Sequence, residues 1–238
     1  MHNLTKIKLF RFLLYCTYPV ALLFIYPFAL LKKKKQGNLF MLFDRYVIGG
    51  AQRIHLDILN CITERPKQLY FTRRSANDAL KDTFYTIPNT DADDIHIWCD
   101  YLLLRLFSVH YFTFYINRHE NATVFSANST FFYDMLPFLK KGVRKIELLH
   151  MFTHGKGGME WFGLGNIQYL DHRIIYDAYT RSNIIKQYAA YGMDEKYLTR
   201  LLFIEPGVYL PPPFEKNFSG PVKVFYAGRG GAKREYGC

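Results

Sequence analysis

Residues 38–62 read Asn38-Leu-Phe-Met-Leu-Phe-Asp44, then Arg45-Tyr-Val-Ile-Gly49-Gly50-Ala-Gln-Arg53, then Ile54-His-Leu-Asp-Ile-Leu-Asn-Cys-Ile62. The first part is a short, nearly unbroken apolar run, which is typical of a strand buried on both faces. Farther along, apolar residues recur at helical spacing, at Ala51, Ile54, Ile58 and Ile62. This spacing predicts a helix that packs that face against a sheet. The stretch therefore predicts a strand, a turn and a helix, and the rest of the chain is organised around it.

The turn contains two adjacent glycines, Gly49 and Gly50. Glycine allows positive φ angles and lets a ligand come close to the backbone. A glycine turn that leads into a helix also presents free N–H groups and the positive end of the helix dipole to an anion. An ordinary strand–helix loop is the alternative interpretation, because paired glycines alone are a weak motif.

Length and charge limit the classes of function. The chain has 238 residues, half of them apolar, which is enough for one large domain or one and a half smaller ones. Its formal net charge of +11 indicates an acidic partner: nucleic acid, anionic lipid or a phosphorylated substrate. Basic residues cluster at 32–35 and at 140–145 without the interleaved aromatic residues of an RNA-binding signature, so we expect no nucleic-acid partner.

Cysteine and acidic residues give no sign of a metal site. The four cysteines are far apart and form no CxxC pair, which indicates free thiols in a reducing compartment. Asp91, Asp93 and Asp94 lack the spacing of an EF-hand, and we interpret them as the start of a helix. We expect no metal.

Residues 12–31 form an uncharged run whose length fits a membrane span. Pro19 and Pro27 weaken that interpretation, since each removes a helical hydrogen bond. The alternative is an interfacial anchor whose lysines contact anionic headgroups. Lys32–Lys35 then keep the following domain on the cytoplasmic side. We therefore expect residues 1–36 to be a hydrophobic membrane anchor with basic flanks.

Strand-like and helix-like segments alternate along residues 37–210. Strands are expected at 67–72, 83–88, 123–128, 145–150, 173–178 and 201–208, and helices at 95–117, 129–138 and 182–191. This alternation predicts a Rossmann-like, doubly wound α/β fold with a mostly parallel sheet. In such sheets, ligands bind outside the carboxyl ends of the strands.

A domain boundary is expected after residue 210. Pro211–Pro213 begin a polar linker over 211–221, and residues 222–238 contain a strand and a basic loop. Because one strand and one loop cannot form a core, we expect residues 222–238 to be the start of a truncated second domain.

Four segments together resemble a known family. They are Gly49-Gly50-Ala51-Gln52-Arg53, Glu147-Leu-Leu-His150, Leu202-Phe-Ile-Glu-Pro-Gly207-Val208, and Val224-Phe-Tyr-Ala-Gly228-Arg229 followed by Lys233. Their order resembles that of the GT-B glycosyltransferases, in particular the retaining transferases of family 4, over residues 38–237. Two departures stand out: Gln52 occupies the position of a glutamate, and Pro206 that of an asparagine.

The resemblance implies an acceptor-side lobe of an enzyme that transfers a sugar from a nucleotide-sugar to a glycan or lipid-linked acceptor, without a further cofactor. Gly49 and Gly50 would let the donor diphosphate or the acceptor approach the first helix. Arg229 and Lys233 would neutralise the phosphate of the leaving group. His150 would contact the donor sugar as the catalytic residue, with His154 as the alternative. Without the rest of the donor site, we expect residues 1–238 alone to have no transferase activity.

Other interpretations stay open. A lone histidine is commonly structural, and a basic loop is commonly a solvated one. The chain is alternatively a non-catalytic, membrane-associated Rossmann-like subunit that a separate C-terminal chain completes. A nucleotide-dependent oxidoreductase is disfavoured because the first turn lacks G-x-G-x-x-G.

Overall fold

A computed structural model of the protein describes residues 2–153, 158–205 and 207. Seven strands form one sheet: β1 Leu39–Phe43, β2 Lys67–Phe71, β3 Thr90–Asp94, β4 Thr123–Ala127, β5 Arg144–Leu148, β6 His172–Ile175 and β7 Leu201–Phe203. Every pair is parallel, and the order is β3-β2-β1-β4-β5-β6-β7. The expected Rossmann-like parallel sheet is therefore confirmed, and its order reverses between β1 and β4.

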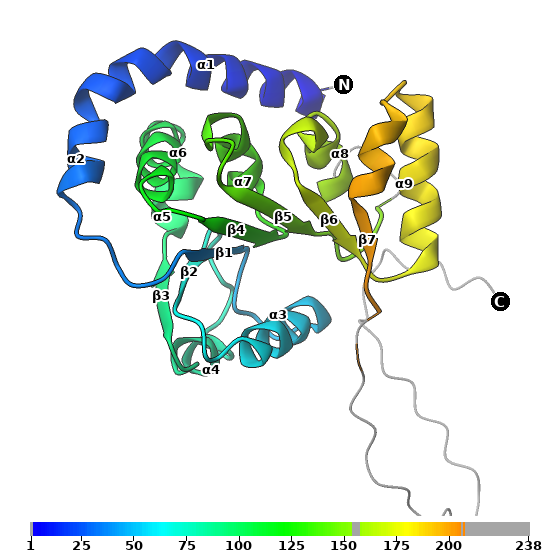
Figure 1. Ribbon diagram of the computed structural model, residues 1–238, viewed down its shortest axis with the longest axis horizontal. Coiled ribbons are helices and arrows are strands. Elements are labelled where there is room, and N and C mark those ends of the chain that lie inside the picture. The colour runs from blue at the N-terminus through cyan, green and yellow to red at the C-terminus, as the bar shows by residue number, and fades with distance from the viewer. Residues whose placement is uncertain (1, 154–157, 206, 208–238) are drawn as a thin grey trace, which may run out of the picture. The chain divides into compact units, whose positions relative to one another are not determined.

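Helices cover both faces of this sheet (Figure 1). They are α1 His2–Phe24, α2 Tyr26–Leu31, α3 Gly50–Cys61, α4 Lys81–Tyr85, α5 His96–Asp100, α6 Leu102–Asn117, α7 Thr130–Met135, α8 Met159–Leu164 and α9 Ala178–Ala190, with short 3₁₀ turns at Leu136–Phe138, Ile167–Tyr169 and Glu195–Arg200. Helices α3 and α4 pack on one face, and α5, α6, α7 and α9 pack on the other.

Strand β1 shows why its sequence is apolar without interruption. Phe40 and Leu42 point into the core beneath α6 and α7, whereas Met41 and Phe43 point into the core beneath α3 and α4. Successive side chains of a strand point to opposite faces, and both faces of this central strand are covered. All five residues of β1 are buried as a result.

Helix α3 forms where the sequence predicts it, but it is rotated from the predicted orientation. Its buried side chains are Gln52, His55, Leu56 and Leu59, while the isoleucines only flank the core. His55 lies on the buried face, where its imidazole stacks on Phe43 with ring centroids 4.0 Å apart. Apolar spacing cannot identify a face whose central residue is a histidine with buried partners.

Two predictions around β3 are wrong. Residues 83–88 form no strand, since α4 covers 81–85. The aspartates at 91, 93 and 94 do not begin a helix but lie in β3 itself. This strand is at the edge of the sheet and pairs only with β2, so its carboxylates reach solvent and a cation. The ammonium of Lys35 lies 2.5 Å from Asp91 and 3.2 Å from Asp93.

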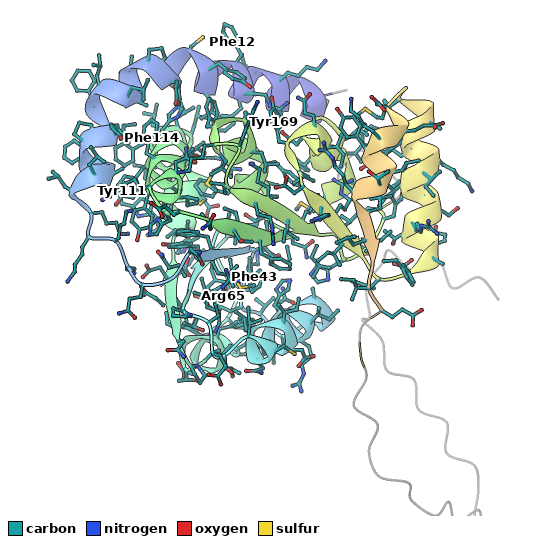
Figure 2. All side chains as sticks on the ribbon, viewed as in Figure 1. Phe12, Phe43, Arg65, Tyr111, Phe114 and Tyr169 are labelled. Atoms are coloured by element: carbon teal, nitrogen blue, oxygen red, sulfur yellow. The ribbon has the colours of Figure 1, made fainter. Side chains whose placement is uncertain are left out.

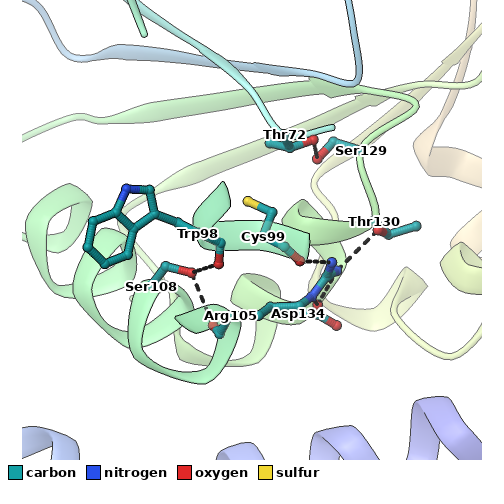
Figure 3. Close-up of polar contacts among 8 residues, drawn as sticks. All are labelled: Thr72, Trp98, Cys99, Arg105, Ser108, Ser129, Thr130 and Asp134. Atoms are coloured by element: carbon teal, nitrogen blue, oxygen red, sulfur yellow. Dashed lines mark hydrogen bonds and ion pairs between the residues drawn. The ribbon is translucent and has the colours of Figure 1, made fainter. Parts of the chain in front are cut away.

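The single helix predicted over 95–117 is two helices, α5 and α6, because Tyr101 has an extended backbone between them (φ −95°, ψ 130°). Arg105 holds the two helices together. Its guanidinium donates to the carbonyl of Cys99 at 3.0 Å, to the carboxylate of Asp134 at 2.6 Å and to the hydroxyl of Thr130 at 3.1 Å (Figure 3). One side chain therefore joins α5, α6 and α7.

The hydrophobic segment predicted as a membrane anchor forms α1 and α2, which pack along α6 and belong to the same compact unit, Met1–Pro206. Leu14, Ala21 and Ala29 are buried in this contact. The hydroxyl of Thr17 lies 3.0 Å from Nε2 of His110, which adds a polar contact to the packing. Among the described residues, no helix has the length and apolar character that crossing a bilayer requires.

The outer face of these two helices is nonetheless apolar and open to solvent. Phe12 is 62 % exposed, Leu23 72 % and Leu31 82 %. Figure 2 shows Phe12 on the side of α1 that faces away from the domain. Exposed apolar surface of this extent commonly marks a contact with a membrane, a protein or a ligand.

Candidate functional site

The candidate site lies at the carboxyl ends of the strands, beside the point where the sheet order reverses between β1 and β4. The chain leaves β1 through Asp44 and enters α3 at Gly50, with Gly49 as the residue before the helix. Gly49 is extended (φ −179°, ψ 162°), and no described side chain caps the helix. The first N–H groups of this twelve-residue helix are therefore available to an anion.

Two arginines follow the neighbouring strand ends. Arg45 comes after β1 and Arg73 after β2, where the N–H of Arg73 donates to the carbonyl of Asp44 at 2.9 Å. Burial raises the pKa of the Asp44 carboxyl, although both guanidiniums act in the opposite direction. This edge of the sheet thus combines a helix N-terminus with two cations.

Gln52 fits this environment better than the glutamate of the resembling family would. It is 7 % exposed, and its amide Nε2 lies 3.5 Å from Oδ1 of Asp44. A second carboxylate here would lie against the first one, whereas an amide can donate to it. The buried amide of Gln52 therefore has a partner in this chain.

A pair of buried histidines joins α3 to the loop after β5. Nε2 of His55 lies 2.7 Å from Nε2 of His150, and the two side chains come from positions 95 residues apart in the sequence. His55 is 0 % exposed and His150 is 7 % exposed. A hydrogen bond of this kind needs one protonated and one unprotonated nitrogen, so the two rings hold opposite roles at Nε2.

The second nitrogen of each ring distinguishes the two histidines. Nδ1 of His150 lies 3.4 Å from the hydroxyl of Tyr176, which follows β6. Nδ1 of His55 is buried and has no hydrogen-bond partner among the described residues. Both nitrogens of His150 therefore contact groups of the protein itself.

Burial makes both imidazoles neutral at physiological pH. It lowers the pKa of His150 to about 4. It also lowers the pKa of His55 well below its ordinary value, and the proximity of His150 lowers it further. A charged imidazole in either position would lose its hydration without gaining an anionic partner.

A buried ion pair lies under the same loop, between β5 and β6. The guanidinium of Arg173 contacts the carboxylate of Glu147 at 2.9 Å and donates to the hydroxyl of Tyr188 at 3.0 Å. The hydroxyl of Tyr133 donates to the same carboxylate. Glu147 and Arg173 are 2 % and 0 % exposed, so this network holds in place the strand β5, two residues before His150.

The predicted site residues fall into two groups. Gly49, Gly50 and His150 all lie at the carboxyl edge of the sheet, with Gly49 and Gly50 beginning the helix that contacts His150 through His55. His154, Arg229 and Lys233 lie outside the described residues.

Sequence reasoning missed His55, Tyr176 and the two arginines. Arg45, Arg73 and Tyr176 each directly follow or nearly follow a strand, so the rule that ligands gather at carboxyl ends could have selected them. His55 had no such signal, because only the rotation of α3 brings it to His150. Among the described residues, no group of three or more histidine, cysteine, aspartate or glutamate side chains could hold a metal ion.

Comparison with known proteins gives limited similarity. No protein-family model matches the sequence, and no curated protein matches it. Solved structures with a similar fold include Anabaena Alr3699/HepE in complex with UDP, with UDP and glucose, and with UDP-glucose. Each is 12 % identical; the matches cover 72 %, 71 % and 71 % of this chain, with TM-scores of 0.49, 0.48 and 0.48. The chain spans 44 % of the length of those proteins, less than half.

Proposed function

We propose that this chain is the acceptor-side lobe of a retaining GT-B glycosyltransferase that moves a sugar from a nucleotide-sugar to a glycan or lipid-linked acceptor. One observation carries the proposal: the uncapped N-terminus of α3 and the loop of His150 lie at one edge of the sheet and are joined by the His55–His150 contact. Two of the four sequence segments that resemble the family contain Gly49, Gly50 and His150 of this edge.

The chemistry of the edge suits a phosphorylated donor. Backbone N–H groups at Gly50 and Ala51, together with the guanidiniums of Arg45 and Arg73, would attract a diphosphate. Arg229 and Lys233, outside the described residues, would stabilise the negative charge that develops on the leaving phosphate. In this proposal His150 fixes the loop against α3 beside the sugar, and no further cofactor takes part.

The acceptor and the location belong to the same proposal. We place the domain on the cytoplasmic side of a membrane, with an acceptor that is itself membrane-bound. The exposed apolar residues of α1 and α2 and the adjacent Lys32 and Lys33 support this arrangement, since apolar surface and basic residues both favour an anionic bilayer.

A second candidate is a non-catalytic subunit of the same fold, completed by a separate chain. It is favoured by the position of His150, whose two ring nitrogens contact His55 and Tyr176. Such a histidine is a good structural element, and it has no ring nitrogen left for a substrate. Turnover by the natural protein distinguishes the two candidates.

The decisive variant is Gly50→Asp in the natural full-length protein. Nothing lies within 4 Å of the position that a Cβ would take at Gly50, and an acidic residue is favourable in the first turn of a helix. The fold is therefore kept, while a carboxylate now faces the diphosphate. Gly142→Asp is the matched control, because Gly142 is equally open but lies in the turn before β5, at the opposite end of the strands.

The assay follows the transfer of a labelled sugar from a panel of nucleotide-sugars to the lipids and glycans of the host membranes. We expect Gly50→Asp to lower transfer tenfold or more, about 1.4 kcal/mol, and Gly142→Asp to leave it unchanged. Equal rates in the two variants would refute the assignment of the α3 N-terminus. Absence of transfer from every donor would instead favour the subunit.

A further inference from the structure

A cavity of about 510 Å³ lies away from the candidate site, between α2 on one side and α5 and α6 on the other. Its walls are mostly aromatic, and they include Phe28, Tyr70, Trp98, Phe107, Tyr111 and Phe112. Protein interiors are normally close-packed, whereas cavities of this size and lining are typical of ligand sites. The cavity is thus a candidate binding site.

The mouth of the cavity is apolar as well. Phe28 on α2 is 61 % exposed and Trp98 on α5 is 45 % exposed, and both residues line the cavity. Leu31, one turn of α2 beyond Phe28, is 82 % exposed, and Ile97, next to Trp98, is 54 % exposed. An apolar chain can therefore reach the cavity from the outer face of the domain.

The acidic groups of the lining already have partners. Asp93 pairs with Lys35 at 3.2 Å. Asp94 accepts from the hydroxyl of Tyr46 at 2.9 Å and contacts Nδ1 of His96 at 2.7 Å. These carboxylates are therefore held by the protein and do not call for a cationic ligand.

Lys32, the basic residue of the lining, has no such partner among the described residues. Nζ of Lys32 lies 5.1 Å from the ring centroid of Tyr115 and 5.8 Å from that of Tyr111, and no described carboxylate is within ion-pair distance of it. Burial lowers the pKa of Lys32, and the charge of Lys35 lowers it further, while the carboxylates of Asp93 and Asp91 act in the opposite direction. An anion beside Lys32 would relieve both effects.

We propose that this cavity binds one chain of an anionic lipid, with the chain between Phe28 and Trp98 and the lipid phosphate at Lys32. The lysines at 32–35 support this orientation, with the lipid phosphate at Lys32. Lys34 donates to the carbonyl of Arg118 at 2.5 Å and Lys35 is paired with β3, so Lys32 and Lys33 are left to meet the headgroups. The proposal is independent of the proposed sugar transfer.

The test uses the two tryptophans of the chain, Trp98 in the cavity and Trp161 outside it. Trp161→Phe leaves Trp98 as the single fluorescent reporter. The probes are vesicles of phosphatidylcholine and phosphatidylglycerol with brominated acyl chains, which quench tryptophan on contact, and monomeric dihexanoylphosphatidylglycerol. Glycerol phosphate tests the headgroup without a chain, and neutral phosphatidylcholine vesicles test the chain without the charge.

We expect brominated anionic vesicles to quench Trp98, and the monomeric short-chain lipid, but not glycerol phosphate, to compete. Lys32→Gln should weaken binding about fivefold, the equivalent of about 1 kcal/mol, and should reduce quenching at equal amounts of bound protein. Lys33→Gln is the matched control, since Lys33 is exposed and does not line the cavity; it should weaken vesicle binding without changing the quenching of bound protein.

Several results would overturn the proposal. If no brominated vesicle quenches Trp98, no lipid chain enters the cavity. Equal effects of the two lysine variants on quenching would reduce Lys32 to a general surface charge. If glycerol phosphate competes as well as the short-chain lipid, the site binds phosphate without an acyl chain. If neutral vesicles quench Trp98 as strongly as anionic vesicles, the negative charge of the lipid has no role.

Discussion

The buried histidine pair makes the stability of the protein depend on pH in a direction that can be worked out. In the unfolded chain an imidazole has a pKa of about 6.5. In the fold, burial lowers the pKa of His150 to about 4 and that of His55 well below its ordinary value. The folded protein therefore binds fewer protons than the unfolded chain between these values, so the free energy of unfolding decreases as the pH falls below about 6.5.

The size of the effect follows from the same shifts. At pH 5 the pH is about 1.5 units below the pKa of an unfolded imidazole, and each pKa unit corresponds to about 1.36 kcal/mol, so the burial of His150 costs about 2 kcal/mol relative to pH 7.5. His55 acts in the same direction, because burial and the proximity of His150 lower its pKa. His110, whose pKa burial also lowers to about 4, contributes in the same direction, so a variant is needed to isolate the pair.

The variant is His55→Leu, and the assay is urea unfolding followed by far-ultraviolet circular dichroism between pH 5 and pH 7.5. At pH 7.5 it should be less stable than the wild type by about 1–3 kcal/mol, because Nε2 of His150 loses its buried partner. At pH 5 this difference should be smaller than at pH 7.5, since the variant no longer carries the titration of His55, whose pKa the fold lowers. For His150→Leu, the difference in unfolding free energy from the wild type should likewise be smaller at pH 5 than at pH 7.5.

A difference in unfolding free energy that stays constant from pH 7.5 to pH 5 would refute this reasoning. It would mean that the two rings are solvated in solution and that α3 is not held to the loop after β5 by their contact. The arrangement of the candidate site would then need another explanation.

Three further substitutions test the polar groups around the site. Arg173→Met leaves the carboxylate of Glu147 buried without its cation and should lower the free energy of unfolding by about 3–5 kcal/mol in urea titrations; a loss below about 1 kcal/mol would contradict a buried pair. Gly163→Ala places a methyl group against Nη2 of Arg173 and should cost about 1–3 kcal/mol, and less in the Arg173→Met background when measured as a double-mutant cycle. Gln52→Glu sets a second carboxylate beside Asp44, so its destabilisation should be larger at pH 7.5 than at pH 5 in thermal melts, and a pH-independent effect would argue against that contact.

Local sequence patterns were sufficient for the elements whose environment is uniform. The apolar run of β1 and the glycine after α9, with φ +61° at Gly192, can be recognised from neighbouring residues alone. Alternation of strands and helices then implies the parallel sheet, and the sheet implies that Gly49, Gly50 and His150 lie at one edge. These inferences need only the spacing of apolar residues along the chain and the right-handedness of the connections between parallel strands.

Patterns failed where a residue's partner is distant in the sequence. The aspartates of β3 resemble a helix cap until the edge position of the strand and the charge of Lys35 are known. The apolar run at 12–31 likewise does not reveal that α1 and α2 lie along α6. In both cases the packing partner comes from a distant part of the sequence.

The sequence by itself determined the fold class and the edge of the sheet where a ligand would bind. Tertiary structure alone decided which polar residues are buried together: His55 with His150, and Glu147 with Arg173. The physical reason is that periodicity depends on near neighbours along the chain, whereas the burial of a polar group is tolerated only when a specific partner arrives from another element. That partner is visible only in three dimensions.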